Sequence, residues 1–374
     1  MVPPVGVPIV ERAIAALDRG EMVVVVDDED RQNEGDLVMA AELVTPERIA
    51  FFLRHTSGLI CTALPSARAD ELELPLMVAQ NTETQRTAFT VTVDAAEGTT
   101  TGISAVDRAR TIAALADGST VPSDLNRPGH MPVLRAEGGG VLSRPGHTEA
   151  AVDLARLAGL EPVGVVCQIV SADRVGIASR SELSAFAGEH GLVMISIAEL
   201  AQHRRQTERQ INRTAYAWLP TRWGRFRAVS YESVVDKGTH LALVLGDPRT
   251  AGDVVVRLHR ECLCGDIFSS VQCSCHRLLD AAMARVAQEG TGVVVYLRGL
   301  ESRGIGMAHA LVPGPLRAVG PFDDPRRRES GEPDRTLQAG SPGYELGLQI
   351  LADMGVKQIV LLSDDDLAPT APTR

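Results

Sequence analysis

The sequence contains no apolar run of the roughly 20 residues that a helix needs to cross a bilayer. Its N-terminus also lacks the basic segment followed by an apolar segment that marks a secretory signal peptide. These absences argue against a membrane-bound or exported protein. We therefore expect no membrane partner and a cytoplasmic location.

Positive charge is also scarce. The 374 residues carry a formal net charge of -11 at pH 7. A general nucleic-acid surface needs clustered Lys and Arg to displace counterions from the phosphate backbone, so we expect no nucleic-acid partner. Any phosphate group bound by this chain must be held locally, by a few dedicated residues.

The cysteines do not form the pattern of a disulfide framework. Four of the six fall between Cys262 and Cys275, while Cys61 and Cys167 stand alone in apolar stretches. This clustering favours a metal site over disulfides, and reduced thiols fit a cytoplasmic protein.

The length and pattern of the chain indicate two domains. Over the first 200 residues or so, helical periodicity alternates with short apolar runs such as 23–26 and 163–170, which is typical of a layered α/β fold. Ser196 to Glu199 has the pattern of a helix-capping box, and the helix becomes strongly charged toward Arg209. We expect an α/β (α+β layered) domain over 1–207 and a second domain over 208–374.

The second domain is predicted to be smaller and β-rich, with an α+β fold. Its predicted strands are 228–235, 241–245 and 254–258, separated by Gly, Asp and Pro turns. Pro, Gly and charged residues dominate 311–343, which indicates a long loop. A helix over 344–354 and a strand over 359–362 should follow.

A dense cluster of carboxylates follows the first strand, in the segment DDEDRQNEGD at 27–36. Strand ends are where α/β folds usually bind ligands. Oxygen-rich ligation is what Mg²⁺ prefers, and the metal would hold a polyhydroxylated substrate through its oxygens. A solvated acidic turn is the alternative interpretation.

Two Pro-Gly-His turns favour a functional site. They are NRPGH at 126–130 and SRPGHTE at 143–149. In the second, Arg144 and the backbone N–H groups of the following helix could bind a phosphate, while His147 offers a nitrogen to a metal. A single His such as His130 is more often a satisfied structural residue. Two in matching turns, together with an acidic loop, form a site hypothesis.

The acidic loop, TTTGISA at 99–105, both Pro-Gly-His motifs and residues 164–169 occur in the order found in 3,4-dihydroxy-2-butanone 4-phosphate synthases. Nearly all of the first 200 residues resemble that family. The resemblance implies a riboflavin-pathway lyase that converts ribulose 5-phosphate to 3,4-dihydroxy-2-butanone 4-phosphate and formate. It also implies a Mg²⁺ (or Mn²⁺) cofactor and a homodimer.

Site residues follow from the same resemblance. It implies catalytic roles at His130, Gln168 and Cys61, with His130 serving proton transfer. The residues implied to bind substrate are Arg31, Gln32, Asp36, Thr101, Arg144, Pro145, Gly146, His147 and Thr148. Gln32 and His147 occupy the family's metal-ligand positions.

Two positions depart from the family pattern, because Gln32 and Gln168 stand where the family has a metal-binding Glu and a catalytic Glu. An amide oxygen can coordinate Mg²⁺, but it brings no charge and exchanges no proton near neutral pH. Loss of a positioned acid–base group typically costs about 10²–10⁴-fold in rate. We expect impaired turnover. An altered reaction on a pentose phosphate and a non-catalytic phosphosugar-binding homologue are the alternatives.

The clustered cysteines predict a second metal site. Cys262, Cys273 and Cys275 offer three thiolate ligands for a tetrahedral Zn²⁺ with an open fourth position. Cys264 as a fourth ligand would close the site, and four unrelated buried cysteines are the remaining alternative.

The surroundings of these cysteines, RLHREC at 257–262 and GLESRGIG at 299–306, resemble GTP cyclohydrolase II, the usual C-terminal partner of the synthase in bifunctional enzymes. The three zinc positions match. However, the family's tyrosine-bearing helix is replaced by the Pro- and Gly-rich segment from Leu311 onward, and two of its motifs are replaced at 340–343 and 364–366. The chain also stops before the family's closing segment. We expect an eroded, truncated domain without cyclohydrolase activity.

Overall fold

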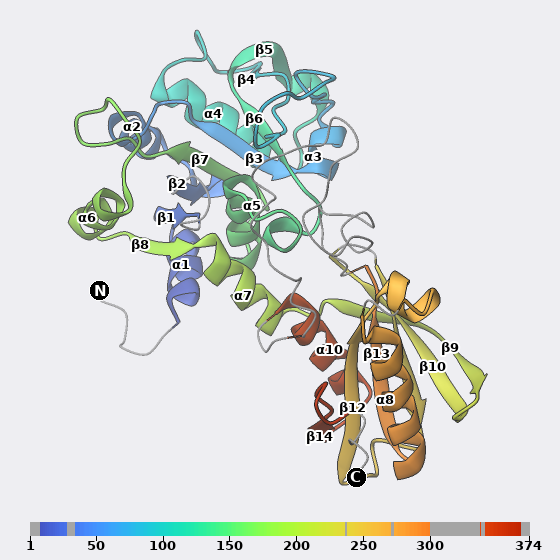
Figure 1. The fold of residues 1–374 in the computed structure, drawn as a ribbon. Coiled ribbons are helices and arrows are strands. Elements are labelled where there is room, and N and C mark those ends of the chain that lie inside the picture. The colour runs from blue at the N-terminus through green and yellow to red at the C-terminus, as the bar shows by residue number, and fades with distance from the viewer. Residues whose placement is uncertain are drawn as a thin grey trace, which may run out of the picture. The chain divides into compact units, whose positions relative to one another are not determined.

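The computed structural model describes residues 8–27, 34–235, 238–270, 273–299, 337 and 341–367. The chain divides into two compact units, Met1–Thr207 (unit 1) and Glu208–Arg374 (unit 2), as Figure 1 shows. Among the described residues, no helix has both the length and the apolar character needed to cross a membrane.

Unit 1 is built on a six-stranded mixed sheet in the order β6-β3-β7-β2-β1-β8. Its strands are β1 (Val23–Val26), β2 (Gly35–Ala40), β3 (Cys61–Pro65), β6 (Val133–Ala136), β7 (Gly164–Gln168) and β8 (Val193–Ser196). β2 lies antiparallel between β1 and β7, so the acidic loop connects two neighbouring strands. A separate ribbon pairs β4 (Val93–Ala95) with β5 (Leu125–Met131).

Helices cover both faces of this sheet, because alternate side chains of the central strands enter two different cores. On β1, Val24 and Val26 join one core and Val23 and Val25 the other. The first core includes residues of α2 (Pro46–His55), α3 (Ser66–Glu71), α4 (Ala105–Ala116) and α6 (Arg180–His190); the second includes α1 (Ile9–Asp18), α5 (His147–Leu157) and α7 (Ile197–Thr207). The predicted α/β class is confirmed for unit 1.

Short helical turns complete unit 1: the 3₁₀ turns η1 (Ala41–Leu43), η2 (Pro122–Asp124) and η3 (Gly140–Leu142). The predicted capping box is confirmed, since the Ser196 hydroxyl accepts from the Glu199 N–H at 3.1 Å and the Glu199 carboxylate accepts from the Ser196 N–H at 2.7 Å. Residues 89–93 alternate in the pattern of a strand, but β4 starts only at Val93. The preceding residues bond to several different partners, Pro75 and Val133 among them, and so form no continuous ladder.

Unit 2 contains a six-stranded sheet in the order β14-β12-β13-β11-β10-β9. Its strands are β9 (Ile211–Thr221), β10 (Gly224–Ser233), β11 (Thr239–Leu245), β12 (Asp253–Arg260), β13 (Gly292–Leu297) and β14 (Gln358–Leu361). Residues of α8 (Cys275–Glu289) and α10 (Pro342–Asp353) enter two separate cores built on this sheet, and a π-helical turn, η4 (Leu263–Ile267), follows β12. The predicted β-rich α+β class is confirmed.

The sequence predicted four of these strands approximately and missed β9, β13 and α8. Their apolar residues are either flanked by polar ones or continuous, so periodicity alone does not separate strand from helix. The loop predicted over 311–343 lies almost wholly outside the described residues.

Candidate functional site

The ends of β1, β2 and β7 and the start of α5 border a cavity of about 240 Å³ in unit 1. Seven of the residues predicted from the sequence line it: Asp36, Cys61, Arg144, Gly146, His147, Thr148 and Gln168. Thr101, His130 and Pro145 are not among its lining residues. Arg31 and Gln32 lie outside the described residues.

One side of the cavity is acidic. Asp27 follows β1 and Glu34 precedes β2. The Asp27 carboxylate accepts from the Glu34 N–H at 2.8 Å, which fixes the base of the acidic loop. Burial raises the pKa of Asp36 and also that of Glu34. Grouped, poorly solvated carboxylates of this kind are stabilised by a bound cation.

Gln168 ends β7 directly opposite Asp36 in the neighbouring strand. Its side-chain amide donates a hydrogen bond to the Glu34 carboxylate, and this contact partly offsets the rise in the Glu34 pKa. A Glu at this position would instead place two carboxyl groups in contact, where they would share a proton. The amide therefore replaces an acid–base pair with a fixed donor–acceptor pair.

His147 is the first residue of α5, and its Nε2 atom is buried without a hydrogen-bond partner among the described residues. Leaving a buried polar atom unpaired costs about 1–3 kcal/mol. The imidazole is close enough to Asp36 and Glu34 to interact electrostatically with both. One imidazole and several carboxylates form a donor set that a divalent cation such as Mg²⁺ would satisfy.

The other side of the cavity is cationic. Arg144 donates to the buried Glu149 carboxylate at 2.7 Å and to the Gln85 carbonyl at 3.1 Å, which orients its guanidinium. Gly146 permits this packing, because a Cβ there would lie 2.5 Å from Glu149. The N-terminus of α5 adds backbone N–H groups, so this side is suited to a phosphate. Glu149 belongs to the predicted SRPGHTE motif, but no role was predicted for it.

His130 and Thr101 belong to a second cluster, on the β4–β5 ribbon and its neighbouring loop. The His130 ring Nδ1 lies 2.7 Å from the Asp94 carboxylate, and its side chain is 49% exposed. Gly102, with φ of +83°, packs against both groups, since a Cβ would lie 2.2 Å from Asp94. No role was predicted for Asp94, which lies a short distance before the TTTG motif in the sequence.

The two lone cysteines of unit 1 meet at the floor of the cavity. Burial, assisted by the neighbouring Cys167, raises the pKa of Cys61 to about 12. The Thr56 hydroxyl donates to the Cys167 sulfur at 3.0 Å. Burial also raises the pKa of Cys167, so both thiols favour the protonated form at neutral pH. The catalytic role implied for Cys61 stays a prediction.

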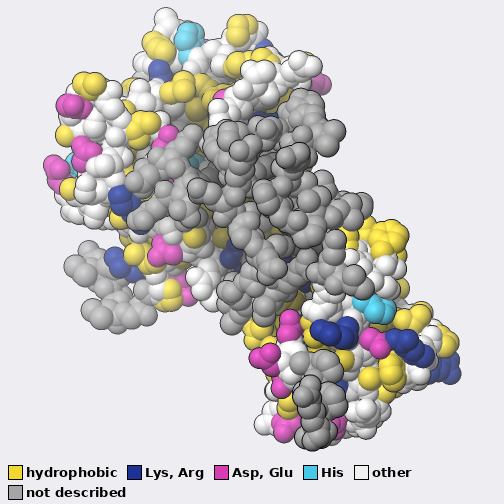
Figure 2. Space-filling model, viewed as in Figure 1, with side chains coloured by type: hydrophobic (Ala, Val, Ile, Leu, Met, Phe, Trp, Pro, Cys, Tyr) yellow, Lys and Arg dark blue, Asp and Glu magenta, His cyan; other side chains and the backbone are white. Residues whose placement is uncertain are grey.

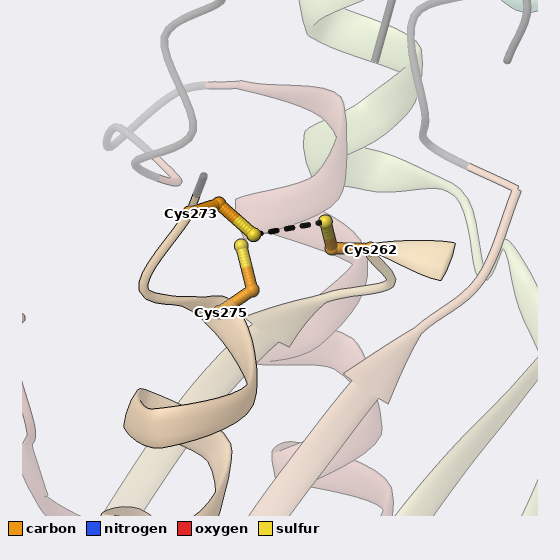
Figure 3. A group of neighbouring side chains, drawn as sticks. All are labelled: Cys262, Cys273 and Cys275. Carbon is orange, nitrogen blue, oxygen red and sulfur yellow. Dashed lines mark hydrogen bonds between the residues drawn. The ribbon is translucent and has the colours of Figure 1, made fainter. Parts of the chain in front are cut away.

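In unit 2, the sulfur atoms of Cys262, Cys273 and Cys275 lie within 4.8 Å of one another. Figure 3 shows the three thiols turned toward a common point, from the segment after β12, the loop before α8 and the first turn of α8. Burial is the main cause that raises the pKa of Cys262, and Cys273 adds to the rise while Cys275 opposes it. Cys264, the alternative fourth ligand, is not part of this group.

A buried polar network supports the three thiols. The Asp266 carboxylate accepts from the Cys262 N–H at 2.9 Å and from the Tyr296 hydroxyl at 2.8 Å. The His259 Nε2 lies 3.1 Å from the same carboxylate. The segment that carries Cys262 is therefore held in place by side chains from β12, β13 and η4.

Comparison with known proteins places both units. The family model of 3,4-dihydroxy-2-butanone 4-phosphate synthase matches residues 11–203, more than half of the chain. The chain belongs to this family. The GTP cyclohydrolase II model matches residues 212–369.

The relatives share this two-part organisation. A riboflavin biosynthesis protein RibBA of Nocardia farcinica is 51% identical over 95% of this chain and 85% of its own length, and the RibBA of Mycobacterium ulcerans is 51% identical over 95% and 84%. RibBX of A. baumannii, described as a two-domain synthase, has a TM-score of 0.72 at 37% identity over 97% of this chain and 94% of its own. A synthase structure with two magnesium ions matches at a TM-score of 0.51 and 46% identity, over 53% and 97%.

Proposed function

We propose that unit 1 binds ribulose 5-phosphate and converts it to 3,4-dihydroxy-2-butanone 4-phosphate and formate at a rate limited by Gln32 and Gln168. The proposal rests on the cavity. It is lined by the oriented Arg144 and the N-terminus of α5, and also by a group of carboxylates and the buried His147. A phosphorylated sugar offers a phosphate to the first set and hydroxyls to the second. Its chemistry fits both.

The cation belongs on the acidic side. His147 Nε2 would hold Mg²⁺ together with a carboxylate from the base of the acidic loop, such as Asp27, and a related synthase structure contains two magnesium ions. Bound Mg²⁺ supplies Lewis-acid polarisation of substrate oxygens. The remaining groups orient the substrate: Arg144 binds its phosphate, and Asp36 and Thr148 accept from or donate to its hydroxyls.

Proton transfer is the weak step. Gln168 exchanges no proton, so removal and return of protons near β7 falls to Glu34, whose pKa is raised by burial. A carboxyl group with a raised pKa is a better proton acceptor than an ordinary surface Glu. Turnover through this substitute is expected to be slow.

His130 requires a second subunit. It lies outside the cavity of its own chain, half-exposed and oriented by Asp94. We propose a homodimer in which His130 of the partner subunit completes the site, together with the exposed Thr101 beside it.

Unit 2 is proposed to bind Zn²⁺ at Cys262, Cys273 and Cys275 as a structural ion, without opening GTP. The end of β14 leads into three consecutive Asp residues, and one of them, Asp364, already binds the Arg257 guanidinium at 2.6 Å. Added negative charge and an occupied arginine both disfavour a triphosphate.

The direct test is NMR of the purified protein with ribulose 5-phosphate and Mg²⁺. Formate together with dihydroxybutanone phosphate supports the proposal. A different phosphorylated product indicates altered chemistry, and unchanged substrate with broadened signals indicates a non-catalytic binding protein. A parallel incubation with GTP and Zn²⁺ should release no formate.

A further inference from the structure

Strand β9 forms an open edge of the unit 2 sheet. It pairs with β10 on one side, and no described strand pairs with its other side. All residues from 212 to 220 are exposed, including Tyr216 at 73% and Trp218 at 56%. An edge of this length presents a row of backbone donors and acceptors to another chain.

Few of the usual protections of an edge strand are present at its centre. Proteins generally blunt such edges with charges, proline, bulges or shortness. On β9 a bulge falls at Thr214 and Pro220 comes near the end, whereas the segment AYAWL at 215–219 between them is regular and carries no charge. The nearby Arg225 lies over the Trp218 ring, 4.7 Å from its centroid, and so shields one aromatic face without blocking the backbone edge. Figure 2 shows basic and hydrophobic side chains close together over the β9–β10 hairpin.

The segment is complementary to itself. In an antiparallel pair, directly opposite residues point to the same face of the sheet. A two-fold axis at Ala217 places Tyr216 opposite Trp218 of the partner subunit, and Trp218 opposite the partner's Tyr216. Ala217 then faces its own copy, so the small residue lies at the centre and the large ones flank it.

Charge also allows this pairing. The regular part of β9, residues 215–219, contains no charged residue, so no two like charges face each other there. Arg213 is moreover neutralised within its own chain by Asp353 at 2.7 Å. The chain as a whole carries a net charge of -11, which disfavours contact between copies over most surfaces, whereas this edge is uncharged.

We propose that β9 pairs antiparallel with β9 of a second copy of this chain about a two-fold axis at Ala217, joining two unit 2 sheets into one. Such a contact is separate from the homodimer proposed for unit 1, and its failure would leave the synthase proposal untouched.

Engineered disulfides test the register in the full chain. Ala217→Cys should form a covalent dimer on mild oxidation, because the two Cα atoms of an opposed pair lie about 4.5–5.5 Å apart, within the range of a disulfide. Thr214→Cys is the matched control, equally exposed on the same strand but about 20 Å from its own copy in this register, at about 3.3 Å per residue. Wild-type protein gives the background from the native cysteines.

A non-reducing gel separates the outcomes. The proposal expects dimer from Ala217→Cys at several times the level seen with Thr214→Cys or wild type. It also expects the loss of that dimer when Trp218→Lys is added, with circular dichroism unchanged. Equal dimer from the two cysteine variants, or none from either, overturns the proposal and leaves β9 to a different partner.

Discussion

The two units hold their candidate sites by different means. In unit 1 the cavity is assembled from segments far apart in the sequence, such as Asp36, Arg144 and Gln168, which the six-stranded sheet and α5 bring together. In unit 2 the three thiols all come from residues 262–275, and a small polar network fixes them. A long-range site requires the whole fold, whereas a local metal cluster can persist in a domain whose other chemistry has changed.

The substitutions differ in the same way. Gln168 is close in size to the Glu that the family resemblance implies, and it bonds Glu34, so the change proposed for unit 1 concerns acid–base capacity and not the shape of the site. In unit 2 the changed positions alter charge, as at Asp364 to Asp366. Four experiments sharpen this contrast.

Restoring the carboxylates should give the largest effect. Gln168→Glu combined with Gln32→Glu is expected to raise the rate of formate release by about 10²–10⁴-fold, because a proton-exchanging group and a charged metal ligand return. Gln85→Glu, which adds a charge to the same cavity at a different lining position, is the matched control and should give no gain. Equal rates for the double variant and wild type would show that the amides do not limit turnover.

Zinc removal should affect unit 2 alone. Both tryptophans, Trp218 and Trp223, lie in unit 2, so tryptophan fluorescence follows its unfolding specifically. Zinc at a thousandfold excess over its Kd stabilises a folded domain by about 4 kcal/mol. Chelation of zinc, or the Cys273→Ser substitution, should therefore strongly lower the unfolding temperature of unit 2. The rate of formate release should stay unchanged.

The control for that experiment is Cys264→Ala, which removes a thiol outside the cluster. It should retain the zinc-dependent rise in the unit 2 transition. If zinc does not change the unfolding temperature of unit 2 in the wild-type protein, the three thiols do not form a structural metal site.

Replacing the phosphate-binding arginine should have a moderate effect. Arg144→Lys keeps the charge but loses the planar, two-pronged donor geometry, and about a tenfold weaker affinity for ribulose 5-phosphate is expected by calorimetry, or about 1.4 kcal/mol. Arg156→Lys, on α5 but outside the cavity, should bind as wild type does. The opposite ranking of the two variants would place the phosphate elsewhere.

The smallest effect concerns pH and stability. The ring of His55 packs 4.8 Å from that of His190, between Phe51 and Phe186. Burial, followed by His190 and Arg54, lowers the pKa of His55, and Arg174 acts in the same direction while Glu189 opposes it. As pH falls, His55 therefore binds a proton in the unfolded chain at a higher pH than in the folded chain. The stability that comes from burying the neutral His55 ring is complete above the unfolded pKa of about 6.5 and is lost as pH falls below it.

His55→Gln should flatten that dependence. The variant is expected to show a smaller drop in the unit 1 melting temperature between neutral pH and mildly acidic pH than wild type shows. His203→Gln, on α7 in the second core of unit 1, is the comparison variant and should keep the wild-type slope. A steeper fall of the melting temperature with pH in His55→Gln than in wild type would show that the pKa of His55 is not lowered by folding.

The sequence predicted the fold class of both units and seven of the residues that line the cavity, because motif order and strand-end carboxylates can be read from the sequence alone. It could not tell that His130 and His147, in nearly identical turns, belong to different clusters. The difference arises from pairing: β5 joins β4 in a separate ribbon, whereas the second turn leads into α5 beside the main sheet. Such pairing depends on long-range contacts.

Strand β9 was missed for a related reason. Nearly all of its side chains are exposed, so it shows neither a buried face nor the alternation that marks a half-buried strand. Glu149 was also overlooked, since its importance comes from burial beneath Arg144. Exposure and burial are properties of the fold, and spacing alone does not report them.

The cavity of unit 1 is proposed to bind a phosphosugar although Gln32 and Gln168 carry amides in place of the carboxylates that the family resemblance implies. Isothermal titration of the wild-type chain with ribulose 5-phosphate in the presence of Mg²⁺ tests it directly. We expect saturable binding of ribulose 5-phosphate at one site per chain, with a weaker affinity in Arg144→Lys. Absence of saturable heat, with the protein folded by circular dichroism, would contradict it.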